Sequence, residues 1–491
     1  MSYMEILSMQ KSFLDKNGIS LDDYRNTFIR KTYTLLLLEY ICFCGVSLLG
    51  KYIYQYEKQW IFWCLVIICQ LCHFYFEYSA SAAENQNKKI SNIVVSVIYL
   101  CCGSFAFLFL WTLLGVNFGD QLWRIYLQIG GVILLLNFYA NMTNTHFQGE
   151  ECWLIVLITP ITIELILNIF IGIYSPLFQT FVTMIITWLS SFMLQITQKQ
   201  KLQKEFTFDE IQVLCCILLG VQFQLLVSLT KSIIKNQNSQ NDLSIASYEI
   251  KLKYFKQISA TYSIIIVILQ ISLMYGCGYE PQCFSHFLIK YNNEDYSFSA
   301  LFWVSLSFSL ILYPLILIFH RRINYIIKWI LVLIEIIFYS LILIGITSFM
   351  VLQDKVTNDN FEMNQTQLSE YLLCIALSMF TGIGIGLEAY SFIKKENIEN
   401  KKAFLFMMIC PIIIFISQIQ FSIIQFEALV IAYIIGILVI FVAYSVVVLL
   451  EINWQLNKDS IDINAKEYQL GAMLIYQPIQ TIIARICTLF I

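Results

Sequence analysis

The chain has 491 residues, of which 58% are apolar and only 13% are charged. A soluble globular protein has about 25% charged residues, so this composition excludes an ordinary water-soluble domain. The formal net charge of −3 is close to neutral and provides no basic surface for a nucleic-acid partner. The composition therefore predicts an integral membrane protein.

The apolar segments are about 20 residues long and do not alternate with period two, so they predict membrane-spanning helices and not the strands of a barrel. Fourteen such segments occur: 32–54, 60–80, 90–115, 121–142, 152–172, 175–196 and 210–234, then 259–278, 298–319, 325–350, 371–393, 403–424, 427–450 and 467–491. We predict an all-α membrane protein with a polar N-terminal segment over 1–31, a seven-helix bundle over 32–234, a polar linker over 235–258 and a second bundle over 259–491.

The two predicted bundles contain similar residues in the same order, which indicates an internal duplication. The separation between partners increases along the chain, as insertions in the second bundle would require. The matched positions are Thr32-Tyr33-Thr34 with Thr261-Tyr262-Ser263, Asn92 with Asn324, Pro160 with Pro411, and Glu210 with Glu467.

Seven segments in each bundle create a conflict in orientation. If every segment crosses the membrane, the second bundle is inverted relative to the first. Basic residues instead gather on the N-terminal side of each bundle, and the positive-inside rule then gives both bundles the same orientation. We favour an inverted repeat because the linker is too polar to cross; the alternative is that one segment does not span.

Histidine and cysteine give no pattern typical of an active site or a metal centre. The cysteines lie mostly within apolar segments, where thiols behave as small apolar side chains. The histidines are scattered, and no nucleophile has a histidine at motif spacing; they are His73, His146, His286 and His320. We therefore expect no enzyme activity, no metal and no cofactor.

Three motifs lie at the ends of predicted helices: Phe28-Ile29-Arg30-Lys31-Thr32-Tyr33, Tyr390-Ser391-Phe392-Ile393-Lys394-Lys395 and Glu467-Tyr468-Gln469-Leu470-Gly471-Ala472. They resemble the Phe-Ile-Arg-Lys-x-Tyr, Phe-Ser-Phe-x-x-Lys and Glu-Glu-Tyr-x-x-x-Ala motifs of the Bax-inhibitor-motif (lifeguard) family of seven-helix membrane proteins. The resemblance implies a tandem duplication of that bundle across most of the chain.

Known members of that family include calcium leak channels that are gated by two aspartates sharing protons, one at the end of helix six and one in helix seven. The resemblance places these positions on Glu451 and Pro478 in the second bundle. In the first bundle they fall on Leu194 or Ile196 and on Val221. Because two carboxylates must lie close together to share a proton, the loss of the pair from both bundles argues against this gate.

Several acidic residues nevertheless lie inside apolar segments, where a charge is costly and indicates function. We predict Glu335, Glu388, Glu451 and Glu164 as candidates for an ion path. The alternative is that these carboxyls are neutral, reach the membrane surface along their side chains, or contact partner subunits. For three charged residues near helix ends, Glu77, Arg124 and Glu451, we favour side chains that reach the membrane surface. Prolines inside three of the segments predict helix kinks, at Pro160, Pro411 and Pro478.

Two functions follow. The favoured one is a non-catalytic membrane scaffold, an accessory subunit that contacts lipid and other membrane subunits in an organelle complex such as the mitochondrial respiratory chain. The alternative is a leak channel of the Bax-inhibitor type for Ca²⁺, another cation or protons. For the location we favour the mitochondrial inner membrane over the endoplasmic reticulum or the Golgi.

Overall fold

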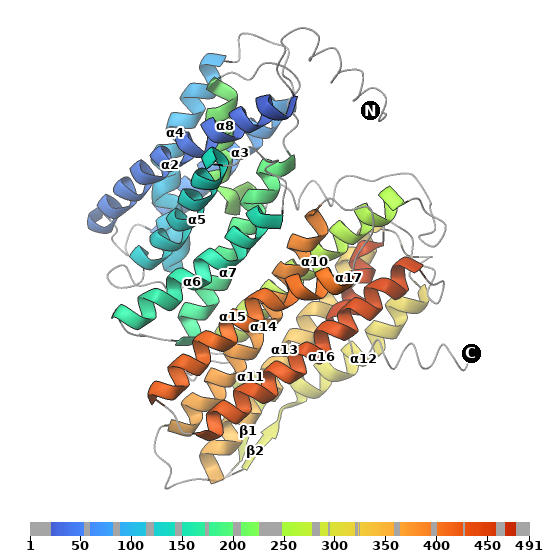
Figure 1. The fold of residues 1–491 in the computed structure, drawn as a ribbon. Coiled ribbons are helices and arrows are strands. Elements are labelled where there is room, and N and C mark those ends of the chain that lie inside the picture. Colours follow the sequence, from blue (N-terminus) through green and yellow to red (C-terminus); the bar gives the residue numbers. More distant parts are fainter. Residues whose placement is uncertain are drawn as a thin grey trace. The chain divides into compact units, whose positions relative to one another are not determined.

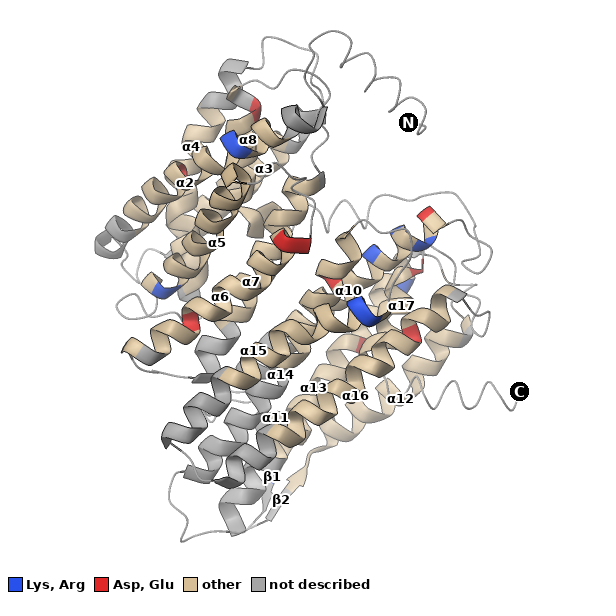
Figure 2. Cartoon of the chain, viewed as in Figure 1, with Lys and Arg blue, Asp and Glu red and all other residues tan. Residues whose placement is uncertain are grey.

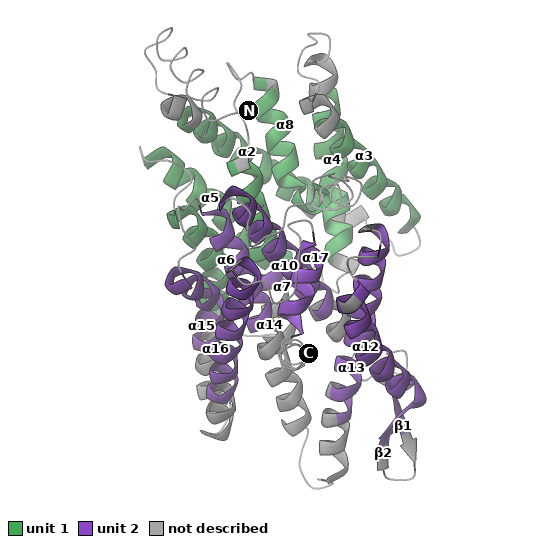
Figure 3. Ribbon diagram, turned by 90° about the vertical axis from the view of Figure 1, so that its right-hand side faces the viewer, with its two compact units in different colours: residues 1–172, 186–235 green, residues 173–185, 236–491 purple. Residues whose placement is uncertain are grey.

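A computed structural model gives the structure of the chain. It describes residues 21–53, 59–81, 89–113, 122–142, 150–171, 176–199, 208–224, 248–276, 285–292, 295–319, 323, 325–357, 364–393, 400–425, 428–457 and 467–477. Over these residues the chain forms fifteen helices and one two-stranded sheet (Figure 1). The chain divides into two compact units: unit 1 contains residues 1–172 and 186–235, and unit 2 contains residues 173–185 and 236–491 (Figure 3).

Unit 1 is built around α2, which packs against α4, α5 and α8. In the same unit α3 packs against α4, α4 against α8, and α5 against α6. The helices are α2 (Leu21–Ile53), α3 (Gln59–Ser81), α4 (Lys89–Leu113), α5 (Leu122–Met142), α6 (Glu150–Ile171) and α8 (Phe208–Leu219), and α7 (Pro176–Lys199) is divided between the two units.

Unit 2 is built around α10, which packs against α13, α14 and α17. Here α12 packs against α13, α13 against α17, α14 against α15, and α16 against α15 and α17. The elements are α10 (Tyr248–Gly276), α11 (Ser285–Leu288), β1 (Ile289–Asn292), β2 (Asp295–Phe298), α12 (Ala300–Phe319), α13 (Tyr325–Thr357), α14 (Asn364–Phe392), α15 (Asn400–Gln425), α16 (Ala428–Asn457) and α17 (Tyr468–Tyr476).

The same helix pairs recur in the two units when the helices are matched in chain order. The pairs α2–α4, α2–α5, α2–α8, α3–α4, α4–α8 and α5–α6 correspond to α10–α13, α10–α14, α10–α17, α12–α13, α13–α17 and α14–α15. If the four-residue helix α11 is left out of the count, the first helix of each unit packs against the third, fourth and seventh helices of that unit.

Six of the described helices are long and apolar enough to cross a membrane. These spans are Val94–Trp111, Leu122–Met142, Tyr248–Leu269, Ala300–Leu317, Ile326–Ile346 and Ile435–Leu456. Lys, Arg, Asp and Glu are sparse along the described helices (Figure 2). Each of the fourteen predicted segments coincides with a helix, although the described parts of α8 and α17 are only 12 and 9 residues long.

Two helices begin earlier than the sequence analysis predicts. Helix α10 begins at Tyr248, so residues 248–258 of the predicted linker are helical, and α2 begins at Leu21 inside the predicted N-terminal segment. The segment 248–258 contains three lysines, which are compatible with a helix. A polar composition excludes burial in lipid but does not exclude helix, because lysine and glutamate are good helix formers.

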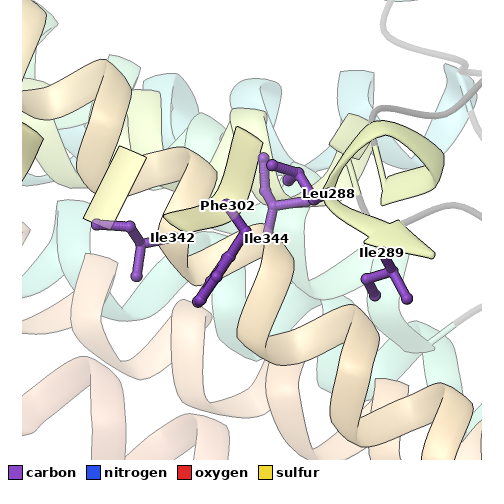
Figure 4. Close-up of a cluster of buried hydrophobic side chains, with 5 residues drawn as sticks. All are labelled: Leu288, Ile289, Phe302, Ile342 and Ile344. Carbon is purple, nitrogen blue, oxygen red and sulfur yellow. The ribbon is translucent and has the colours of Figure 1, made fainter. Parts of the chain in front are cut away.

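The sequence analysis did not predict the β1–β2 hairpin that precedes α12. Its antiparallel register pairs Ile289 with Phe298 and Asn292 with Asp295. Leu288 and Ile289 pack with Phe302 of α12 and with Ile342 and Ile344 of α13 in one apolar cluster (Figure 4). The hairpin is thereby fixed to the first turn of α12 and to the middle of α13.

Candidate functional site

Glu164 lies in a buried polar network between α5 and α6 of unit 1. Arg124 Nη1 donates hydrogen bonds to Glu164 Oε1 and to Asn168 Oδ1, both at 2.9 Å. Gln128 Nε2 donates to the second carboxylate oxygen of Glu164 at 2.6 Å. Arg124 is only 3% exposed and is enclosed by the chain itself, and its predicted reach to the membrane surface stays a prediction. The Glu164 carboxylate is thus paired with one cation and one amide, whereas Asn168 accepts from the same cation.

Glu335 on α13 has a different environment, because its hydrogen-bond donors are uncharged. Ser309 Oγ of α12 donates to Glu335 Oε1 at 2.5 Å, and Gln477 Nε2 at the end of α17 donates to the same oxygen at 3.0 Å. Gln477 Nε2 also contacts the hydroxyl of Tyr476 at 2.9 Å. Glu335 is fully buried. Three helices of unit 2 therefore meet at one carboxyl group.

Glu451 and Glu388 are buried in two other helices of unit 2. Gln455 Nε2 donates to Glu451 Oε1 at 3.0 Å and to the carbonyl oxygen of Gly471 on α17 at 3.2 Å. Glu451 is only 7% exposed, and its predicted reach to the membrane surface also stays a prediction. All four acids predicted for an ion path are therefore buried, and the described hydrogen bonds of Glu164, Glu335 and Glu451 come from Arg, Gln or Ser side chains.

Two buried tyrosine hydroxyls form a short hydrogen-bonded chain that ends at α17 in unit 2. The hydroxyls of Tyr262 on α10 and Tyr444 on α16 lie 2.7 Å apart, and Tyr444 donates to the carbonyl oxygen of Ile475 at 3.3 Å. Ile475 is the penultimate residue of α17, so its carbonyl has no partner within the helix and Tyr444 satisfies it. In unit 1, Tyr33 on α2 contacts Thr197 Oγ1 on α7 at 3.3 Å.

The predicted kink positions Pro160 and Pro411 lie inside α6 and α15, and Pro478 lies outside the described residues. Each proline helix has a glycine of the preceding helix against it. A Cβ atom on Gly382 would lie 3.1 Å from Cδ of Pro411, and one on Gly131 would lie 3.6 Å from Cγ2 of Thr159, the residue before Pro160. The absence of a side chain at these glycines lets the helix pairs approach closely.

At the junction of α3, α4 and α8, unit 1 has a second buried polar group. His73 Nδ1 lies 3.2 Å from Gln224 Oε1, and because an amide oxygen only accepts, Nδ1 carries the proton. A Cβ atom on Gly220 would lie 2.5 Å from His73 Nε2 and closer still to the hydroxyl of Tyr99. Among the described residues neither His73 Nε2 nor the Tyr99 hydroxyl has a hydrogen-bond partner.

No metal site emerges from these groups: within the described part of the chain, no three His, Cys, Asp or Glu side chains are placed to hold a metal ion. In unit 1, the polar partners of Glu164 and Arg124 could have been predicted from their spacing in the sequence. Gln128 follows Arg124 by four residues, and Asn168 follows Glu164 by four, so each apolar helix carries a two-residue polar face. Ser309 also follows Ser305 by four residues, whereas Gln477 has no polar residue four positions before it.

In comparisons with protein-family models, with curated proteins and with solved structures, nothing matches this chain.

Proposed function

We propose that this chain is a non-catalytic membrane scaffold, composed of two Bax-inhibitor-like seven-helix bundles, that serves as an accessory subunit of a larger complex in an organelle membrane. The mitochondrial inner membrane, with its respiratory chain, is the location we favour. The observation that carries the proposal is the identity of the partners of Glu164 and Glu335, which are not carboxyl groups. Glu164 pairs with Arg124, Glu335 with Ser309 and Gln477, and the calcium gate of the resembled family needs two carboxyls in contact.

The recurrence of helix pairs in the two units supports the duplication within this proposal. The α2–α5 and α5–α6 packing of unit 1 has its counterpart in the α10–α14 and α14–α15 packing of unit 2. Gly131 and Gly382 are separated by the same number of residues as Pro160 and Pro411, and each glycine packs on the helix with the proline. A shared origin of the two bundles explains both the recurring helix pairs and the matched glycines. The glycine match is independent support, because the repeat was inferred from other residues.

Large apolar side chains on the outer helix faces support a role in contact with lipid and neighbouring subunits. On α3, Trp60 is 66% exposed and Leu71 is 62% exposed. On α12, Trp303, Phe308 and Ile311 are each more than half exposed. Such faces are unstable in water, and a bilayer or an apolar protein surface covers them.

The test begins with a tagged full-length chain extracted from its native membrane in a mild detergent. We expect it to migrate with a large complex, at a constant ratio to the other subunits. Reconstituted alone in liposomes, it should pass no more Ca²⁺ than protein-free liposomes. Glu451→Gln and Glu335→Gln should leave the flux unchanged. A solitary monomer that conducts Ca²⁺, and loses conduction in either variant, would refute the scaffold and establish the leak channel.

A further inference from the structure

The Glu335–Gln477 pair of unit 2 is buried and has two oxygen atoms whose hydrogen-bond partners are not yet accounted for. Both side chains are at least 99% buried. Oε1 of Glu335 receives both donors, from Ser309 and Gln477. The other two oxygens of the pair, Glu335 Oε2 and Gln477 Oε1, have no hydrogen-bond partner among the described residues. Two acceptor oxygens are thus left unsatisfied in a place where each costs about 1–3 kcal/mol.

We propose that this pair is a proton-binding site: Glu335 carries a proton on Oε2 and donates it to Oε1 of Gln477. The amide of Gln477 already donates to Oε1 of Glu335 at 3.0 Å. One added proton therefore satisfies both remaining oxygens and gives a carboxylic acid–amide pair with two antiparallel hydrogen bonds. The step is a protonation in which an O–H bond forms at Oε2 and one O–H bond of a hydronium ion breaks to leave water, so no oxidant or reductant is needed.

The surroundings of Glu335 favour the neutral acid over the carboxylate. A buried carboxylate without a cation costs several kcal/mol, whereas a protonated carboxyl only needs an acceptor. Glu164 in unit 1 has Arg124 at 2.9 Å, but the hydrogen-bond donors to Glu335 are a hydroxyl and an amide. The short contact from Ser309 Oγ to Glu335 Oε1 is compatible both with a carboxylate and with the carbonyl oxygen of an acid. The two forms differ in whether Oε2 carries a proton.

The titratable groups around the pair are phenols. Tyr339 of α13 and Tyr476 of α17 are in electrostatic contact with Glu335, and Tyr313 of α12 lies beside Tyr476. On α16, Tyr444 bonds to Ile475 and Tyr262. The charged residue Lys328 of α13 forms an ion pair with Glu467 at the start of α17.

On the remaining neighbours of α13, charged residues lie in the hairpin (Lys290, which is exposed, and Asp295), in α14 (Glu370 and Glu388) and at the beginning of α10. Lys256 of α10 lies 5.1 Å from the ring centre of Phe392, and Glu388 is one turn before Phe392 on α14. Neither makes a hydrogen bond to Glu335.

A junction in unit 1 shows how a neutral donor serves another buried glutamine, although Gln224 is not at the position that the repeat matches with Gln477. There α3, α4 and α8 correspond in chain order to α12, α13 and α17. Gln224, which follows α8, accepts a hydrogen bond through Oε1 from the N–H of His73. In unit 2 the glutamine at the end of the seventh helix also needs a donor for Oε1, and the proton on Glu335 supplies it. This inference does not depend on whether the protein is a scaffold or a channel.

Infrared difference spectroscopy of the full-length chain in lipid at neutral pH tests the site. We expect the wild-type spectrum to contain the C=O band of a protonated carboxyl, and Glu335→Gln to lose one carboxyl equivalent of it. Gln477→Leu should move that band to higher frequency because the acid loses its acceptor. The matched control is Glu164→Gln, which should leave the band unchanged because Glu164 is ionised beside Arg124.

Thermal unfolding gives an independent readout. Wild-type stability should fall as the pH rises, because the folded state holds a proton that the unfolded chain releases, and Glu335→Gln should be insensitive over the same range. A carboxylate band that disappears in Glu335→Gln, or an acid band that Gln477→Leu leaves in place, would overturn the proposal. Failure of Glu335→Gln to fold would also overturn it, because glutamine reproduces the hydrogen bonds of the protonated acid.

Discussion

Arg124 Nη1 lies 2.9 Å from Oε1 of Glu164, and this ion pair joins α5 to α6 inside unit 1. Both side chains are more than nine-tenths buried, so each charge depends on the other. Replacing one partner leaves an uncompensated charge in a low-dielectric interior, whereas replacing both removes the cost of burying either.

We therefore predict that Glu164→Leu destabilises unit 1 by about 3 kcal/mol, and that Arg124→Met costs a similar amount. The double variant should be more stable than either single variant. Buried thiols in unit 1, among them Cys152, Cys215 and Cys216, allow unfolding to be followed with a thiol-reactive fluorescent dye. Additive losses in the double variant would show that the two charges are independent.

Helices α14 and α15 are in backbone contact at Gly386, which yields a second prediction. A Cβ atom there would collide with the main chain of Phe406 and lie 2.9 Å from Cα of Met407. Because backbone atoms cannot rotate away, Gly386→Ala should destabilise unit 2 by about 1–3 kcal/mol through overpacking. Dye labelling of Cys410, which is buried in α15, reports the separation of the two helices.

Gly436 on α16 is the matched control, because nothing lies within 4 Å of a Cβ atom at that position. Gly436→Ala removes backbone freedom from a helix and should be neutral or stabilise by up to about 1 kcal/mol. Equal losses in the two glycine variants would contradict the close approach of α14 and α15.

Ser299 connects the hairpin to α12 and supports a third prediction. Its hydroxyl donates to the carbonyl oxygen of Phe287 at 2.6 Å and accepts from the amide of Phe302 at 3.4 Å, as a helix N-cap does. Ser299→Ala should therefore cost about 1 kcal/mol and accelerate hydrogen exchange at the Phe302 amide. Ser299→Thr keeps the hydroxyl and should retain most of the protection; equal exchange in both variants would rule out the cap.

The helices could be predicted from sequence because apolar segments of bilayer length are an averaged property of many residues. The average apolarity of a segment does not reveal which residue each buried acid contacts. Whether Glu164 has a cation depends on the rotation of α5 against α6, and Gln477 reaches Glu335 only because α17 ends at that level of α13. The hairpin was missed because strands of four residues carry too little periodicity to separate them from a loop.

The hydroxyl chain from Tyr262 through Tyr444 to Ile475 predicts an order of effects. Tyr444 donates to the Ile475 carbonyl and therefore receives the proton of Tyr262. Tyr262→Phe removes one donor and leaves the carbonyl satisfied, so it should cost about 1 kcal/mol. Tyr444→Phe leaves both the buried hydroxyl of Tyr262 and the terminal carbonyl of α17 unpaired, so the loss should be larger, about 2 kcal/mol or more.

Tyr33→Phe in unit 1 is the comparison variant for the hydroxyl chain. Thr197 donates its own proton to the carbonyl oxygen of Met193, so Tyr33 is the donor in the Tyr33–Thr197 contact. Its removal resembles that of Tyr262 and should cost about 1 kcal/mol. Unfolding in detergent measures all three variants. A loss for Tyr262→Phe equal to or above that for Tyr444→Phe would mean that Tyr444 does not satisfy the end of α17.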